Sequence, residues 1–264
     1  MKLDILMSCM HQTDGSLIGA SHITGNAVVI NQCDREEDRV FDTENSRVRF
    51  ISTTQRGLTR SRNLAIATSD ADICLLCDDD EVFVDGYEQK ILSAYERLPQ
   101  ADVVIFRMVN YPCAFGDQVR QLKFPQTMHV ASWQISFRRE SLLRTGVRFD
   151  ELLGAGSGNG AEEELKFLLD CQKAGLQIWY APVDIATVAQ EASTWFDGFN
   201  EKFFYDRGAT TRYILGAPLA AAYGVYYVAK KRAMYRDTIT PARALGAIFR
   251  GMLDNPITKQ ARKA

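Results

Sequence analysis

Short apolar runs recur along the first 106 residues of this 264-residue chain. They are partly β-branched and are bounded by polar turns, which is typical of strands buried on both faces of a mostly parallel sheet. The runs are Leu3–Cys9, Ala27–Asn31, Val48–Ile51, Ile73–Cys77 and Val103–Phe106. The pattern therefore predicts that the N-terminal part of the chain builds the core of a sheet.

Helical segments separate several of these runs. Thr59 is a suitable N-cap for a helix ahead of the fourth run, and Asp85–Leu98 has the pattern of a second helix. Alternating strands and helices imply right-handed crossovers, so we expect an α/β sheet flanked by helices.

The second half of the chain has a looser pattern. Strands are predicted at Val130–Phe137 and Gln177–Pro182, with a glycine-rich loop and a helix from Ala161 to Gly175 between them. From about residue 196 the pattern is helical throughout. We therefore expect an α/β domain over residues 1–195 and a helical region over residues 196–264.

The near-neutral formal charge of −2 hides an asymmetry. Residues 1–199 carry 19 basic and 29 acidic side chains, whereas residues 200–264 carry 12 basic and 4 acidic ones. The basic region lacks the aromatic pattern of an RNA-binding module, so no nucleic-acid partner is expected. Six cysteines, and an N-terminus too polar for a secretion signal, predict a cytoplasmic protein. The lone Cys74-x-x-Cys77 pair is interpreted as buried packing rather than a zinc or redox site.

The clearest chemical signal is a strand that ends in consecutive carboxylates. Asp78, Asp79 and Asp80 follow the apolar run Ile73–Cys77 directly. Ligands of open α/β sheets bind beyond the carboxyl ends of the strands, and adjacent carboxylates repel one another unless a cation neutralises them. Ligation by oxygen alone favours magnesium, manganese or calcium. A solvated turn that caps the next segment is the alternative.

Two further segments hold candidate site residues. Glu162–Glu164 lie at a predicted helix start, where they either stabilise the helix dipole or supply a general base. The basic run Arg56–Asn63 opens another helix and suits a phosphate group; the alternative is that Arg62 and Asn63 pack inward. The chain has no GxxxxGK[ST] and no strand-coupled GxGxxG, which argues against nucleoside triphosphate hydrolysis and dinucleotide binding.

Taken in order, these motifs resemble glycosyltransferase family 2, the inverting sugar transferases of the GT-A fold. The resemblance covers residues 3–195. It rests on Gly57 with Arg62-Asn63, Asp78-Asp79-Asp80, Phe149-Asp150-Glu151, Gly154-x-Gly156 and the Glu162–Glu164 cluster. It implies a GT-A, Rossmann-like, mostly parallel sheet flanked by helices, with a helical C-terminal extension.

The resemblance also implies roles on the donor side. Asp78 and Asp80 would hold Mn²⁺ or Mg²⁺ on the diphosphate of a nucleotide sugar, because departure of the nucleoside diphosphate builds negative charge. Gln190 stands where many members have a metal-binding histidine and is the expected further ligand. The expected nucleotide-sugar contacts are Asn31, Asp34, Arg56, Arg62, Asn63 and Asp79.

On the acceptor side, the resemblance implies that Glu164 is the catalytic base, with Glu163 as its orienting or acceptor-binding neighbour. Besides Gln190, two features depart from the family pattern. Asn31 matches an aspartate that often contacts the uracil ring, and Ser8-Cys9-Met10-His11 replaces a Pro-Thr-Tyr-Asn type of turn.

The helical region has a feature of its own. Residues 213–229 carry no charge, but two glycines and a proline interrupt them, and a bilayer span needs about 20 apolar residues. Because Lys230-Lys231-Arg232 follows, residues 213–236 are expected to lie on the inner face of the cell membrane as a peripheral element. Packing on the catalytic domain, or on a second copy in a homo-oligomer, is the alternative.

The sequence thus predicts a metal-dependent inverting glycosyltransferase. Its expected partners are a nucleotide-sugar donor, in the first instance a UDP-sugar, and a hydroxyl of a surface-polysaccharide or lipid-linked glycan acceptor. One alternative is a non-catalytic nucleotide- or glycan-binding subunit of a glycan-assembly complex. The other is a sugar-nucleotide nucleotidyltransferase, which would need a glycine- and arginine-rich loop that Ser8–Gly15 does not supply.

Overall fold

The computed structural model describes residues 1–42, 46–159, 162–189 and 198–262. The chain separates into two compact units. Unit 1 comprises residues 1–149 and 164–190, and unit 2 comprises residues 150–163 and 191–264. The boundary expected at 195 falls outside the described residues and stays a prediction. The structure adds that the segment Asp150–Glu163 clusters with the C-terminal helices.

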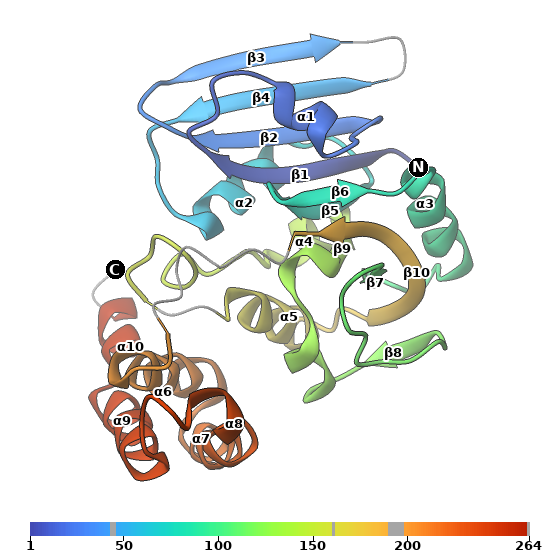
Figure 1. Cartoon of the computed structure of the whole chain (residues 1–264). Coiled ribbons are helices and arrows are strands. Elements are labelled where there is room, and N and C mark those ends of the chain that lie inside the picture. Colours follow the sequence, from blue (N-terminus) through green and yellow to red (C-terminus); the bar gives the residue numbers. More distant parts are fainter. Residues whose placement is uncertain (43–45, 160–161, 190–197, 263–264) are drawn as a thin grey trace. The chain divides into compact units, whose positions relative to one another are not determined.

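Unit 1 is built on one mixed sheet, and its first strands are the blue ribbons of Figure 1. The strand order is β3-β4-β2-β1-β5-β9-β7-β10-β6, with β8 paired to β10. Strands β4, β2, β1 and β5 run parallel, whereas β3, β9, β6 and β8 pair antiparallel with their neighbours. The expected α/β sheet flanked by helices is confirmed. The strands are β1 (Leu3–Met10), β2 (Asn26–Gln32), β3 (Glu37–Asp42), β4 (Arg47–Thr53), β5 (Ile73–Asp78), β6 (Glu81–Phe83), β7 (Val103–Met108), β8 (Arg120–Leu122), β9 (Ile135–Arg138) and β10 (Ile178–Val188).

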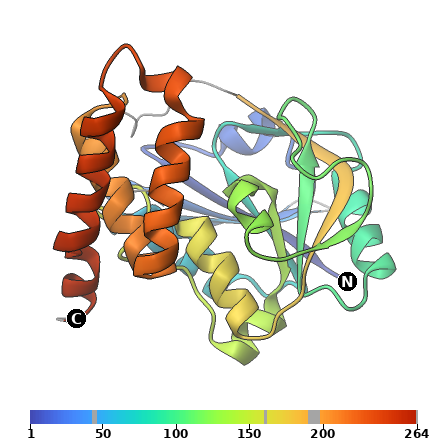
Figure 2. The same cartoon turned by 90° about the horizontal axis from the view of Figure 1, so that it is seen from below.

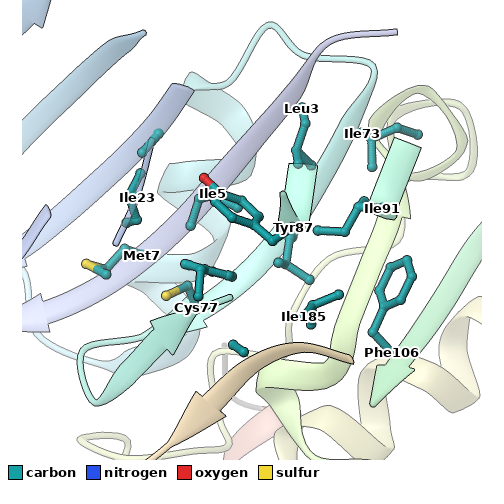
Figure 3. Close-up of a cluster of buried hydrophobic side chains, with 14 of the residues drawn as sticks. Leu3, Ile5, Met7, Ile23, Ile73, Cys77, Tyr87, Ile91, Phe106 and Ile185 are labelled. Atoms are coloured by element: carbon teal, nitrogen blue, oxygen red, sulfur yellow. The ribbon is translucent and has the colours of Figure 1, made fainter. Parts of the chain in front are cut away.

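Apolar side chains alternate between the two faces of this sheet and form two cores. One core gathers β1, β5 and helix α3 (Tyr87–Arg97), and Figure 3 shows Ile5, Tyr87 and Ile91 within it. The other lies under α2 (Leu58–Thr68) and α5 (Glu163–Lys173) and contains the stacked rings of Phe149 and Phe167. Two short helices, α1 (Ser16–Ala20) and α4 (Arg139–Thr145), complete the helices of this unit among the described residues. The strands are thereby fixed from both sides, which sets the positions of the loops at their ends.

The structure corrects two local predictions. The strand predicted at Val130–Phe137 is interrupted by a 3-10 turn at Ser132–Gln134, and β-strand pairing begins only at Ile135. Thr59 does not cap α2. It lies inside the helix, which follows Gly57 at a φ of 119°, a conformation that suits glycine.

Unit 2 is helical in its C-terminal part, and Figure 2 shows its long helices in orange and red. They enclose a core of aromatic, aliphatic and small residues that includes Phe204, Tyr235 and Ile248. None of the helices that the structure describes is long and apolar enough to cross a membrane. The helices are α6 (Glu201–Leu215), α7 (Ala217–Lys230), α8 (Arg232–Tyr235), α9 (Pro241–Asp254) and α10 (Pro256–Ala261).

Helices α6 and α9 cross at very short range because each presents a glycine to the other. A Cβ on Gly251 would lie 2.0 Å from the carbonyl oxygen of Tyr205, and a Cβ on Gly208 would lie 2.0 Å from that of Ile248. Only glycine fits at either position without separating the two backbones.

Candidate active site

The carboxyl ends of the parallel strands β1, β2, β4 and β5 meet at one edge of unit 1. Most of the predicted donor-site residues end or follow these strands: Asn31 and Asp34 at β2, Arg56 after β4, and Asp78, Asp79 and Asp80 at β5. Arg62 and Asn63 reach the same region from α2. The sequence motifs are therefore brought together where an α/β sheet binds its ligands.

The side chain of Asp78 is held from two sides. Arg62 Nη2 donates to its Oδ1 at 3.0 Å, and the hydroxyl of Ser132 donates to its Oδ2 at 3.3 Å. The Arg62 side chain is only 1% exposed, whereas that of Asp78 is 29% exposed. Each carboxylate oxygen can accept more than one hydrogen bond, so Asp78 remains able to bind a further donor or a cation.

Glu81 fixes the backbone of the same turn. Its Oε1 accepts the amide of Asp78 at 2.6 Å, while its Oε2 is buried with no partner in the described part of the chain. Burial raises the pKa of Glu81 well above its usual value, and the charges of Asp78 and Asp80 raise it further. Desolvation and the charge of Asp78 also raise the pKa of Asp79, which lies at the surface next to Asp80.

Asn63 connects α2 to the last residue of the first segment of unit 1. Its Nδ2 donates to the carbonyl oxygen of Phe149 at 2.9 Å, and its Oδ1 accepts the amide of Phe149 at 2.9 Å. The Arg62 guanidinium lies 5.5 Å from the centre of the same Phe149 ring. The Arg-Asn pair thus packs inward, as one of the two sequence alternatives expected, and it joins Phe149 to the acidic strand end.

Arg56 and Asp34 lie on neighbouring loops and pair at 2.5 Å between Nη2 and Oδ1. Arg56 Nη1 also donates to the carbonyl oxygens of Cys33 and Thr54, at 3.0 and 2.9 Å. Asp34 has a largely exposed side chain, so this edge of unit 1 presents one carboxylate and one guanidinium to solvent.

Asn31 is fully buried and hydrogen-bonded to the protein. Its Oδ1 accepts the amide of Gln12 at 2.9 Å, and its Nδ2 donates to the Gln12 carbonyl at 2.8 Å and to the Ser52 hydroxyl at 3.1 Å. The side chain ties the loop after β1 to the ends of β2 and β4. Its predicted contact with a nucleotide base stays a prediction.

Oxygen atoms at the acidic turn fit a hard divalent cation. Within the described residues, no group of three or more His, Cys, Asp or Glu side chains is placed to hold a metal ion. Magnesium sites often use one or two protein carboxylates and complete their coordination with substrate phosphates and water. Asp78 and Asp80 fit that chemistry, while the expected further ligand Gln190 lies outside the described residues.

The glutamate cluster divides into residues with different surroundings. Glu162 has a φ of 85°, a region that non-glycine residues rarely adopt, and its carboxylate accepts from Arg207 Nη1 at 2.5 Å. Glu163 and Glu164 are the first two residues of α5, and the boundary between the units falls between them. The predicted roles of Glu163 and Glu164 toward an acceptor stay predictions.

The glycine-rich segment is anchored inside unit 2. Besides the Glu162–Arg207 pair, the Tyr213 hydroxyl donates to Asp150 Oδ2 at 2.6 Å, and Asn159 Nδ2 donates to Gln260 Oε1 at 3.2 Å. Arg207 itself stacks on the Tyr227 ring, 4.3 Å from its centre. These contacts fix the segment that precedes α5.

Sequence reasoning missed the contacts that position the site. Ser132 was not singled out, and Phe149 was named only as part of a motif, because both lie far from Asp78, Arg62 and Asn63 in sequence. Glu81 directly follows the three aspartates, and this adjacency was the signal that could have indicated its contact with the Asp78 amide.

Comparisons with known proteins bear on the family and the fold of the chain. The model of glycosyl transferase family 2 matches residues 27–151, so the resemblance seen in the sequence is confirmed over that range. No curated protein sequence matches the chain.

Solved structures share the fold. TarS 1-349 from S. aureus in complex with UDP-GlcNAc superposes with a TM-score of 0.62 at 14% identity, over 96% of this chain and 82% of that one. The same protein in complex with UDP gives a TM-score of 0.61 at 15% identity, over 98% and 83% of the two chains. At these identities the likeness establishes the fold alone.

Proposed function

From the match to glycosyl transferase family 2 and the shared fold, we propose that this protein is an inverting glycosyltransferase that uses a UDP-sugar as donor. The observation that carries the proposal is the placement of Arg62, Asn63 and Asp78 at the carboxyl edge of the parallel strands. TarS structures hold UDP and UDP-GlcNAc on the same fold, which supports a uridine nucleotide as the first donor to test.

On the donor side, Asp78 and Asp80 would hold Mn²⁺ or Mg²⁺. When bound, the ion would supply positive charge to the diphosphate that leaves the sugar. Arg62 and Ser132 hold the Asp78 carboxylate at the strand end, so the carboxylate need not reorganise when the donor binds. Asp34, Arg56 and Asp79 surround the same edge and are the proposed contacts to the nucleotide sugar.

On the acceptor side, Glu164 would act as the general base. The acceptor hydroxyl oxygen bonds to the anomeric carbon as the bond from that carbon to the diphosphate breaks, and the hydroxyl proton passes to the Glu164 carboxylate. Attack from the side opposite the leaving group inverts the anomeric configuration. Glu163 would orient the base or bind the acceptor.

The test is release of UDP from a panel of UDP-sugars, measured with and without Mn²⁺. Glu164→Gln should lower kcat by at least 100-fold and leave UDP affinity within about threefold, because the amide cannot take the proton. Glu96→Gln is the matched control, since Glu96 is exposed on α3. Full activity of Glu164→Gln would remove Glu164 as the base, and no binding or turnover of any UDP-sugar would overturn the donor assignment.

Calorimetry separates the enzyme from the non-catalytic alternative. A glycosyltransferase of this kind should bind UDP more tightly with Mn²⁺ than without it, and Asp80→Asn should remove that difference. Binding of UDP without turnover of any donor would instead identify a nucleotide-binding subunit of a glycan-assembly complex.

We further propose that unit 2 contacts the cytoplasmic face of the membrane, where a lipid-linked glycan acceptor would lie. Large apolar side chains on α7 and α8 are exposed next to a basic cluster, a combination that suits anionic headgroups. The apolar residues are Leu219, Val225, Tyr226 and Met234, and the basic ones are Lys230, Lys231, Arg232 and Arg236.

Vesicle sedimentation tests the membrane contact. The protein should bind vesicles that contain phosphatidylglycerol better than pure phosphatidylcholine, and binding should fall as salt rises. Leu219→Glu should weaken binding, whereas Leu143→Glu, at an equally exposed position on α4, should not. Self-association that rises with protein concentration and is lost in Leu219→Glu, without vesicle binding, would assign the same surface to a homo-oligomer.

A further inference from the structure

Unit 1 contains a cavity at the amino ends of its parallel strands, the edge opposite the acidic turn. The cavity has a volume of about 580 Å³, which lies within the usual range for small-molecule sites. Side chains at the starts of β1, β2 and β4 line it, together with residues of β3 and the C-terminal end of α2. We call this space the amino-end cavity.

The pairing of strands β2, β4 and β3 shows which side chains form the floor of the amino-end cavity. Val28 of β2 pairs with Arg49 of β4, and Arg49 pairs with Val40 of β3, so these three side chains lie side by side on one face of the sheet. Helix α2 covers the same face where it contacts β1 and β2, and it ends at Thr68. The floor beyond that end carries both apolar and charged side chains.

Asp4 provides the second observation. The residue is 4% exposed and lines the cavity, and its Oδ2 accepts the Ser69 hydroxyl at 2.6 Å. Its Oδ1 has no hydrogen-bond partner in the part of the chain that the structure describes. A buried carboxylate oxygen without a donor is costly, so a donor supplied by a ligand would be favoured at this position.

The charges of the cavity favour a neutral ligand. Arg49 pairs with Asp38 at 2.7 Å, Lys2 pairs with Asp70, and Arg47 lies 3.7 Å from Asp42. The three cations that line the cavity, Lys2, Arg47 and Arg49, are matched by three carboxylates, Asp4, Asp38 and Asp70. An added anion or ammonium group would therefore have to separate existing pairs rather than neutralise an excess charge. A hydroxyl group can donate to a carboxylate and accept from a guanidinium without that cost.

We propose that the amino-end cavity binds a neutral saccharide unit, with a hydroxyl group donating to Asp4 and the ring resting against Val40. Carboxylate, guanidinium and amide side chains, the last from Asn26, together offer the donors and acceptors that neighbouring sugar hydroxyls require. The site lies at the other edge of the sheet from the donor site. It rests on the proposed function only for the identity of the saccharide, which would belong to the glycan that the enzyme extends.

Saturation-transfer NMR on the full chain tests this proposal. The neutral probes are N-acetylglucosamine, its β-1,4-linked disaccharide, maltose and lactose, and the charged probes are spermidine and inorganic phosphate. At least one neutral saccharide should bind. Val40→Trp, which places a large ring over the cavity from a half-exposed strand position, should weaken that binding at least tenfold.

Phe41→Trp is the matched control, because Phe41 neighbours Val40 on β3 but points to the opposite face and contacts Phe50. It should leave saccharide binding within about twofold. Asp4→Asn should weaken binding several-fold, and UDP binding with Mn²⁺ should be the same in all three variants.

Three results would overturn the proposal: no saccharide binding, equal binding by Val40→Trp and the native chain, or preferential binding of spermidine or phosphate. Because UDP binding is measured separately, loss of the donor site and loss of this site are distinguishable.

Discussion

Arg62 offers the sharpest test of how the acidic strand end is held. Replacement of Arg62 by Met keeps much of the apolar volume of the side chain but removes the guanidinium. Asp78 then loses a hydrogen bond of 3.0 Å and its counter-charge, and the Phe149 ring loses the cation 5.5 Å from its centre.

The size of the effect follows from burial. Removal of one member of a buried ion pair costs about 3–5 kcal/mol, because the other charge is left without compensation. The Asp78 side chain is 29% exposed, so water can solvate its charge in the variant and reduce that cost. We therefore expect Arg62→Met to lower the free energy of unfolding by about 3 kcal/mol, at the lower end of that range.

Urea unfolding followed by circular dichroism measures this difference from the shift in midpoint at constant m-value. Arg60→Met is the control, because Arg60 is exposed on the same helix, and it should cost no more than about 0.5 kcal/mol. Asp78→Asn removes the charge that Arg62 compensates, so the double variant should lose less than the sum of the single ones. A loss below about 1 kcal/mol for Arg62→Met, or equal losses for Arg62→Met and Arg60→Met, would refute the argument.

Three other predictions address the rest of the molecule. Gly251→Ala should lower the thermal midpoint and reduce the free energy of unfolding by about 1–3 kcal/mol, because the new Cβ meets the Tyr205 carbonyl. Gly246→Ala on the same helix adds a Cβ that meets no atom within 4 Å, so it should stabilise the fold slightly. Burial raises the pKa of Asp4, so the folded state holds its proton more tightly than the unfolded state, and native stability should fall as pH rises from about 4 through the raised pKa. The side chain in Asp4→Asn cannot ionise. Chemical unfolding should therefore show that the stability of this variant, relative to the native chain, is higher at pH 7 than at pH 4. The reverse order would contradict a raised pKa for Asp4. Mass spectrometry after brief iodoacetamide treatment should find Cys113 modified first, because the other five cysteines are buried, and rapid modification of any of these would contradict their interpretation as packing residues.

The strands that the sequence predicted correctly share one physical property. Leu3–Met10, Asn26–Gln32 and Ile73–Asp78 are buried on both faces, so an uninterrupted apolar run identifies them. Strand β3 was missed because nearly all of its residues are exposed, and its sequence EDRVFD carries no apolar pattern. What holds β3 in place is its pairing with β4, a contact that the local sequence does not encode.

The candidate site likewise combines features that the sequence predicts with contacts that it does not. The acidic strand end and the Arg62-Asn63 pair could be predicted because each is a compact sequence motif next to a predicted element. Their contacts with Ser132 and Phe149 could not be predicted, since both residues reach the site through the fold of distant segments. Glu162 could not be separated from its neighbours by sequence either, because its role depends on Arg207, 45 residues later.

The anchoring of the glycine-rich segment has a consequence for synthesis of the protein. Asp150, Asn159 and Glu162 leave the ribosome well before Tyr213, Arg207 and Gln260, which are their partners in unit 2. Domains generally begin to fold from the N-terminus while the chain is being made. The sheet can therefore form early, but the segment that leads into α5 gains these contacts only after residues 207–260 have been synthesised. A nascent chain that has not yet reached these residues would therefore carry a formed acidic strand end while its glycine-rich segment still lacked these anchoring contacts.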